Sequence, residues 1–91
     1  MYIKNVNGSG RFAAPAGYSS WLDYWNQHAS HKALRCGTTD CHHCGNLVGA
    51  HVQKAYSSDL KWYIVPLCSS CNQKTDIFDV DEELVPVPSN L

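Results

Sequence analysis

Two Cys-x-x-Cys units constrain this chain more than any other feature of its sequence. Cys41 and Cys44 form the first unit, Cys68 and Cys71 form the second, and residues 45–67 separate them. Each such turn directs two sulfur atoms toward one point, so two turns supply the four ligands of a tetrahedral zinc ion. Gly45 follows the first unit and suits a tight turn because it has no Cβ. We therefore predict a structural zinc site formed by Cys41, Cys44, Cys68 and Cys71.

Cys36 leaves a second ligand set open. Its Cys-x4-Cys spacing to Cys41 also permits a zinc knuckle, so Cys36 can take the place of Cys44. The tighter turn and the adjacent glycine favour Cys44. His42 and His43 lie between the two thiols of the first unit, where side chains usually point outward, and we expect them to be exposed polar residues rather than ligands.

The length and the cysteine count favour metal over disulfides. A chain of 91 residues forms one domain and buries only about 60 to 65% of its unfolded surface, so additional stabilisation is expected. Five cysteines cannot all pair, and in a reducing compartment Cys-x-x-Cys units more often bind zinc. The start of the chain lacks the apolar segment of a signal peptide, and no apolar run approaches the roughly 18 residues of a membrane span. We expect a soluble, cytoplasmic protein.

Charge is distributed unevenly along the chain. Residues 1–75 carry all seven Lys and Arg against three acids, which is a net charge of +4, whereas residues 76–91 carry five acids and no base. The total is therefore −1. A mildly basic body with an acidic tail can indicate interaction with nucleic acid or with a protein partner, and a solvated tail that aids solubility is the alternative.

The pattern of apolar residues predicts a small α+β domain in three parts. Residues 1–18 are expected to be a loop or a loosely docked arm, residues 19–75 the zinc-braced domain, and residues 76–91 an acidic C-terminal tail. A helix is predicted over about residues 20–30, with Ser20 as its N-cap and Asp23 in its first turn. The apolar face of this helix consists of Trp21, Leu22, Trp25 and Ala29. We predict that this face packs in the core rather than stacking on bases.

Two strands and a second helix are predicted around the thiol pairs. Residues 47–52 and residues 62–65 have strand character, and the polar stretch between them is expected to close a hairpin. Pro66 suits the approach to a helix that begins near Cys68 and Cys71. Within the tail, Pro86 and Pro88 exclude a central strand, so any strand there lies at an edge.

The order of these motifs resembles the HNH family of nucleases. The resemblance covers residues 41–72: a thiol pair, a strand ending in Gly49-Ala50-His51-Val52, a hairpin, a second strand, and Cys68-x-x-Cys71 followed by Asn72. It implies a ββα-metal fold, in which a treble-clef zinc site braces the hairpin and the zinc-side helix. It also implies that His51 is the general base and that Asn72 holds a catalytic Mg or Mn ion.

Two positions depart from the family pattern. Ala50 stands where the family has a metal-binding side chain directly before the histidine, and Tyr63 stands in place of its central asparagine. Because Mg²⁺ prefers oxygen ligands, the loss of one weakens the predicted catalytic site. His51 is alternatively a structural histidine that bonds a backbone carbonyl, and Asn72 is alternatively a cap or turn residue.

Three functions follow from this interpretation. The first is a zinc-binding, HNH-like domain that binds nucleic acid, with DNA the expected partner and with weak or lost nuclease activity. Its predicted phosphate contacts are Lys54, Lys61 and Lys74. The second is an active, metal-dependent endonuclease that uses His51, of the kind expected in a phage or mobile element. The third is a protein-interaction or inhibitor module that uses the fold as a scaffold.

Overall fold

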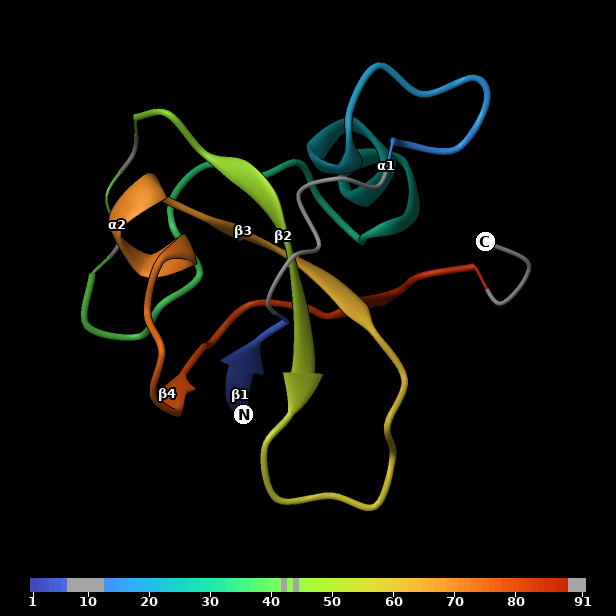
Figure 1. Ribbon diagram of the computed structural model, residues 1–91. Helices are drawn as coiled ribbons and strands as arrows, with labels where there is room; N and C mark the ends of the chain where they lie inside the picture. Colours follow the sequence, from blue (N-terminus) through green and yellow to red (C-terminus); the bar gives the residue numbers. More distant parts are fainter. Residues whose placement is uncertain (7–12, 42, 44, 89–91) are drawn as a thin grey trace.

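The computed structural model describes residues 1–6, 13–41, 43 and 45–88. These residues form an antiparallel sheet of five strands, accompanied by two helices (Figure 1). In chain order the elements are β1 (Tyr2–Asn5), α1 (Trp21–His28), β2 (Val48–Lys54), β3 (Tyr63–Leu67), α2 (Ser69–Asn72), β4 (Phe78–Asp79) and β5 (Val85–Pro86). Neither helix in this described part combines the length and apolar character that crossing a bilayer requires.

The hairpin predicted from the sequence forms the centre of the sheet. β2 and β3 pair antiparallel, with Ala50 opposite Val65 and His51 opposite Ile64. All five residues of β3 are buried, which fits its β-branched and aromatic composition. The strand order is β4-β1-β2-β3-β5, so the hairpin has a neighbour on each side.

The first residues form a strand rather than the expected loop or arm. β1 pairs with β2 on one side and with β4 on the other, and Ile3, at its centre, is fully buried. Only one apolar side chain of this strand enters the core, so its sequence carries little periodicity. Backbone hydrogen bonds to two neighbouring strands hold it in place instead, and such bonds leave no signal in composition.

The acidic C-terminal segment is also part of the sheet rather than a free tail. β4 pairs with β1 at one edge, and β5 pairs with β3 at the opposite edge. The chain from β4 to β5 therefore crosses from one side of the sheet to the other, as Figure 1 shows in red. Pro86 lies on an edge strand, which is the position that a residue without a backbone N–H tolerates.

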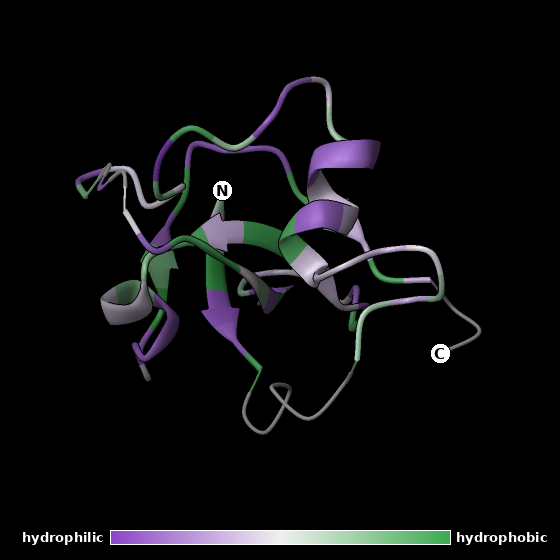
Figure 2. Cartoon of the chain, turned by 90° about the horizontal axis from the view of Figure 1, so that it is seen from above, coloured by the Kyte–Doolittle hydropathy of each residue, from purple (hydrophilic) through white to green (hydrophobic). Residues whose placement is uncertain are grey.

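Helix α1 begins as its sequence predicts. The Ser20 hydroxyl accepts a hydrogen bond from the Asp23 backbone N–H at 3.0 Å, and the Asp23 carboxylate accepts one from the Ser19 N–H at 3.1 Å. This reciprocal arrangement satisfies donors at the start of the helix. Trp21 and Trp25 are buried together with Tyr24, so the aromatic side chains belong to the core. In Figure 2 the outward side of α1 is hydrophilic.

The two faces of the sheet contribute to two different cores. Because successive side chains of a strand alternate in direction, Ala50 and Val52 face one side and His51 faces the other. The first core joins the sheet to the cysteines, and it contains Ile3, Cys36, Ala50, Val52, Tyr63, Val65, Leu67, Cys68, Cys71, Phe78 and Val80. The second core lies beneath α1 and contains Trp21, Tyr24, Trp25, Ile64 and Val85.

Gly49 allows α1 to approach β2 closely. A Cβ at this position would lie 2.5 Å from the backbone nitrogen of Leu22 and 2.5 Å from the backbone carbon of Trp21. Backbone atoms cannot move aside as the end of a flexible side chain can. The start of α1 therefore rests directly on the β2 backbone, one residue before Ala50.

Candidate metal centre

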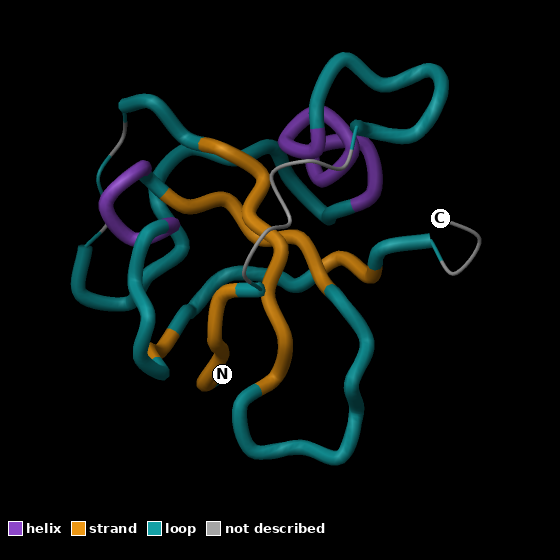
Figure 3. Tube along the Cα trace, viewed as in Figure 1, coloured by secondary structure: helices purple, strands orange, loops and turns teal. Residues whose placement is uncertain are grey.

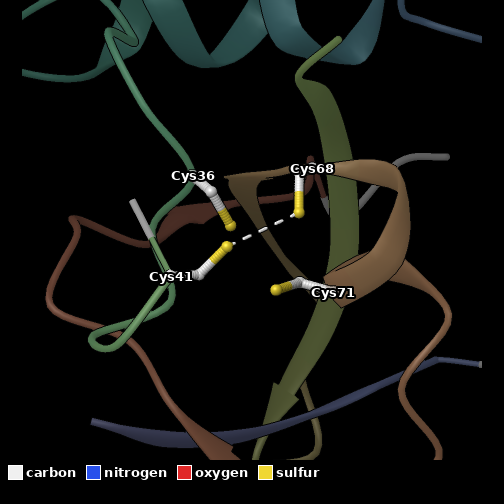
Figure 4. Close-up of side chains that lie close together, drawn as sticks. All are labelled: Cys36, Cys41, Cys68 and Cys71. Atoms are coloured by element: carbon white, nitrogen blue, oxygen red, sulfur yellow. Dashed lines mark hydrogen bonds between the residues drawn. The ribbon is translucent and has the colours of Figure 1, made fainter. Parts of the chain in front are cut away.

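Four cysteine sulfur atoms from two separate segments meet in the first core. Cys36 and Cys41 come from the loop between α1 and β2, whereas Cys68 and Cys71 lie at the end of β3 and on α2 (Figure 4). Any two of the four sulfur atoms lie within 4.8 Å of each other. Among the described residues this is the one group of three or more His, Cys, Asp or Glu side chains with the spacing of a metal site.

The dimensions of the cluster fit a zinc ion. Sulfur atoms bound to one tetrahedral zinc at about 2.3 Å lie about 3.8 Å from each other. The Cys41 and Cys68 sulfur atoms are 3.8 Å apart, and all four thiols are free of disulfides. No pair of the four sulfur atoms is farther apart than 4.8 Å. A set of four thiols is also the donor chemistry that selects zinc over magnesium or calcium.

Burial and hydrogen bonding act in opposite directions on the thiols of the cluster. Cys36, Cys68 and Cys71 are buried, and Cys41 is exposed. Burial, as the largest cause, raises the pKa of the Cys71 thiol to about 12. Burial also acts to raise the pKa of Cys36, but hydrogen bonds with Thr38 and with the Cys68 backbone outweigh it and lower that pKa to about 7. A bound cation would replace the thiol protons, since zinc ligands must be deprotonated.

Backbone hydrogen bonds position the Cys36 segment. The Cys36 N–H donates to the His43 carbonyl at 2.7 Å, which closes the loop around the first two thiols. The next N–H, from Gly37, donates to the Pro66 carbonyl on β3 at 2.8 Å. A Cβ at Gly37 would lie 2.9 Å from the Glu82 side chain and 3.1 Å from the Pro66 oxygen. A side chain here would push Cys36 away from the second thiol pair.

The second thiol pair lies on a one-turn helix that β1 supports. The Asn72 N–H donates to the Cys68 carbonyl at 2.9 Å, which closes the turn containing both thiols. The Asn5 side chain donates to the Cys71 carbonyl at 3.0 Å and to the Lys74 carbonyl at 2.9 Å. Asn5 thus fixes the backbone of the turn that carries Cys71. The sequence did not indicate this role, because residues 1–18 were expected to be a loop or a loosely docked arm.

The structure brings together the ligand set that contains Cys36. Cys41, Cys68 and Cys71 belong to both sets that the sequence left open, and all three lie in the cluster. Cys44 and His42 lie outside the described residues, so the set with Cys44 stays a prediction. His43 is exposed and is not part of the cluster. Cys36 is completely buried in the structure, and the spacing of cysteines in the sequence does not reveal this burial.

His51 lies beneath helix α1. Its imidazole is 5% exposed and meets the Trp21 and Trp62 rings edge-on, at centroid distances of 4.8 and 5.8 Å. Burial lowers the pKa of His51 below its ordinary value, so the ring is neutral near pH 7. A neutral imidazole has the protonation state of a general base, but the indole rings around this one limit access by water or a phosphate.

Asn72 lies on the other side of the sheet from His51. The alternation of β2 directs Ala50 toward the core that contains Cys68 and Cys71, and directs His51 toward Trp21 of α1. Asn72 follows Cys71 on α2 and is exposed. The two residues that the HNH resemblance assigns to catalysis thus lie on different elements, His51 on β2 beneath α1 and Asn72 on α2, and their catalytic roles stay predictions.

The predicted phosphate-binding lysines have contacts within the chain. The Lys54 ammonium lies 3.7 Å from an Asp59 carboxylate oxygen and 4.9 Å from the centre of the Tyr63 ring. Tyr63 donates its hydroxyl hydrogen to Asp59, and this bond is the main cause that lowers the pKa of Asp59. Lys74 lies 5.9 Å from the centre of the Phe78 ring, and Lys61 is exposed.

Fold and site together describe a small α+β domain with a four-cysteine cluster that could bind a metal such as zinc. Comparisons with protein-family models, with curated proteins and with solved structures find no match to this chain. The functional interpretation therefore depends on the chemistry of its own residues.

Proposed function

We propose that this chain is a zinc-stabilised, non-catalytic domain that binds nucleic acid. The observation that carries the proposal is the meeting of four cysteine sulfur atoms within 4.8 Å of one another, from segments that the whole hairpin separates. Zinc held there would be structural, since all four positions of a tetrahedral ion would be filled by sulfur and none would remain for water or substrate. Its ligands would be Cys36, Cys41, Cys68 and Cys71.

The position of the cluster supports a role in folding. It links the loop after α1 to the end of β3 and to α2, so zinc would join two segments that lie far apart in the sequence. A structural zinc ion contributes on the order of 10 kcal/mol of apparent folding free energy, which is as large as the net stability of many small domains. The knuckle, hairpin and short α2 support a treble-clef interpretation of this arrangement.

The surroundings of His51 support the absence of catalysis. An HNH-type nuclease would need a base and an ion on the same side of the hairpin, within reach of one phosphate. Here α1 covers the His51 side, and Ala50 offers no ligand atom on the Asn72 side. Among the described residues, no group of three or more His, Cys, Asp or Glu side chains at the spacing of a metal site contains His51, Asp40, Asp59 or Asp76.

The distribution of charge supports nucleic acid as the partner. Two acids of the C-terminal segment are bonded to residues that follow α1: Glu83 accepts hydrogen bonds from Ser30, and Glu82 contacts His31. These contacts hold two carboxylates beside the end of α1 and away from the hairpin loop. The hairpin and the end of α2 then carry three lysines, Lys54, Lys61 and Lys74, against one acid of the hairpin, Asp59, which is paired with Lys54.

Metal content and nuclease assays test the proposal directly. The purified chain is expected to contain one zinc per molecule and to lose its native circular dichroism when a strong chelator is added. Zinc-loaded protein with Mg²⁺ or Mn²⁺ is expected to leave plasmid and single-stranded DNA intact, as is the His51→Ala variant. It should still retard DNA in a gel, with an affinity that falls steeply as salt increases.

Either of two results would refute it. Cleavage that requires both the divalent ion and His51 would establish the endonuclease in place of the binder. Absence of any nucleic-acid binding at low salt, with zinc bound and the fold intact, would leave a protein-interaction module, whose complexes persist at high salt.

A further inference from the structure

The sheet face beside α1 carries a second chemical feature, a pair of exposed tyrosine rings. Tyr2 on β1 is 54% exposed, and Tyr56, at the start of the hairpin loop, is 78% exposed. Their ring centroids are 5.9 Å apart, with planes inclined at 70°. The Ala55 N–H donates to the Tyr2 carbonyl at 2.9 Å, which fixes the loop against β1. Neither ring belongs to one of the two cores, so packing of the interior does not explain this exposed aromatic pair.

Lys4 lies on the same face as this pair. Residues two apart on a strand point the same way, so Tyr2 and Lys4 face away from the buried Ile3 between them. Lys4 pairs with Gln53 of β2, and the Gln53 side chain donates to the Leu60 carbonyl of the hairpin loop at 2.9 Å. We call the surface formed by Tyr2, Lys4, Gln53 and Tyr56 the tyrosine face.

Helix α1 leaves the tyrosine face open. The helix packs over β2 and β3, where His51 and Ile64 lie, and β1 is outside its main contacts. The loop between β2 and β3 extends away from α1, and the start of β1 lies beside the end of β2, where this loop begins (Figures 1 and 3). The rings and the lysine are therefore at the end of the sheet that the helix does not cover.

The charge of this end favours an anionic partner. Across residues 1–6 and 53–63 the chain carries Lys4, Lys54 and Lys61 against one acid, Asp59, which is paired with Lys54. Asp79 also lies beside Tyr2, and its carboxylate is occupied by the amino group of Met1 at 2.9 Å and the Thr39 hydroxyl at 2.9 Å. Lys4 has no carboxylate contact among those described for this end, whereas the Lys61 backbone N–H donates to the Asp59 carboxylate at 2.8 Å.

We propose that the tyrosine face binds single-stranded nucleic acid, with bases stacked on Tyr2 and Tyr56 and the backbone held by Lys4. Exposed aromatic rings flanked by cations are the combination that single-strand binders use, because every base offers a face for stacking while duplex bases are already stacked on each other. The inference rests on the proposed function and specifies the form of nucleic acid that is bound. It assigns binding to Tyr2, Lys4 and Tyr56, whereas the sequence pointed to Lys54, Lys61 and Lys74.

Fluorescence anisotropy of zinc-loaded protein with a labelled thymine oligonucleotide, and with a duplex of equal length, tests this proposal. The single strand is expected to bind more tightly than the duplex. Tyr56→Ala should weaken single-strand binding about tenfold or more, and Tyr56→Phe should retain it, because stacking needs the ring and not the hydroxyl. Lys4→Gln should reduce the slope of log affinity against log salt by about 0.7.

Matched controls separate these effects from general changes of the surface. Leu34 is 76% exposed and lies in the segment between α1 and Cys36, so Leu34→Ala removes a similarly exposed apolar side chain elsewhere. Lys32→Gln removes an exposed lysine from the same distant segment. Both variants are expected to bind the oligonucleotide as the unmodified chain does.

The possible results distinguish failure of this inference from failure of the proposed function. Duplex binding equal to or stronger than single-strand binding, or an unchanged affinity in Tyr56→Ala, would overturn the tyrosine face and leave a nucleic-acid binder of another kind. Absence of binding to either oligonucleotide would overturn both. Self-association of the chain that Tyr56→Ala abolishes, measured by sedimentation, would identify the tyrosine face as a contact between copies.

Discussion

The sulfur atoms of Cys41 and Cys68 lie 3.8 Å apart, although residues 42–67 separate them in the chain. That distance is about the edge of a zinc–sulfur tetrahedron. The intervening residues contain all of β2 and β3, so the distance between these two atoms depends on the register of the hairpin. The metal site and the hairpin are therefore expected to form as one cooperative unit.

Substitution of single cysteines distinguishes the two ligand sets. Cys36→Ser is expected to lose most of the zinc-dependent stability, because it removes a buried donor from the cluster, and Cys44→Ser is expected to retain one zinc per chain. Metal content after gel filtration, with thermal unfolding, measures both effects. The reverse pattern, with zinc lost in Cys44→Ser and kept in Cys36→Ser, would establish the set that contains Cys44.

Gly49→Ala is expected to destabilise the domain by about 1 to 3 kcal/mol, since the new methyl group would meet the α1 backbone at 2.5 Å. Urea unfolding of zinc-loaded protein gives the free energy difference. Gly45→Ala is the matched control, because a Cβ at Gly45 meets nothing nearer than 3.4 Å. Equal stability of the two variants would mean that α1 is not seated on β2 as described.

His31 is expected to stabilise the fold in its protonated form. Its Nε2 lies 3.0 Å from the Glu82 carboxylate and its Nδ1 lies 2.9 Å from the Lys32 carbonyl, so both ring nitrogens face acceptors. The Lys32 carbonyl, and then Glu82, raise the pKa of His31. A raised pKa means that the folded state binds the proton more tightly than the unfolded state. The contribution is therefore complete below about pH 6.5 and is lost as pH rises through the folded-state pKa.

Melting temperatures of the unmodified chain and of His31→Ala test this dependence. The difference between the two should be largest near about pH 6 and should shrink toward about pH 8. Glu83 also faces this histidine, so Glu83→Gln checks whether the effect depends on Glu82 alone. A difference that is constant across this range would show that His31 does not change its protonation on folding.

His51 is expected to have the opposite effect. Burial lowers its pKa, so the unfolded chain binds the proton more readily, and stability falls as pH decreases through about 6.5. The His51→Gln variant should lose less stability than the unmodified chain between about pH 7.5 and pH 6, a range in which thiol protonation affects both proteins alike. Equal losses would indicate that His51 is solvated, as a working general base would be.

Some elements follow from local sequence alone. Ser20, Asp23 and the spacing of Trp21 and Trp25 define where α1 begins and which side it buries, because capping and helical periodicity involve only neighbouring residues. The β-branched and aromatic run of β3 predicts a buried strand for the same reason. The paired thiols indicate a zinc site before any fold is known, since the donor chemistry is contained in the residues themselves.

Other features were decided only by tertiary structure. The sequence predicted no strand at residues 2–5 and allowed only an edge strand in the C-terminal segment; β1 and β5 form where the hairpin offers two edges for pairing. The burial of Cys36 depends on where Gly37 meets Pro66, residues that are remote in the chain. The side of the sheet that His51 faces depends on strand alternation, and its burial there depends on the docking of α1. Local sequence encodes donors, caps and periodicity, whereas which groups meet depends on the register and docking of distant segments, and those are set by the packing of the whole chain.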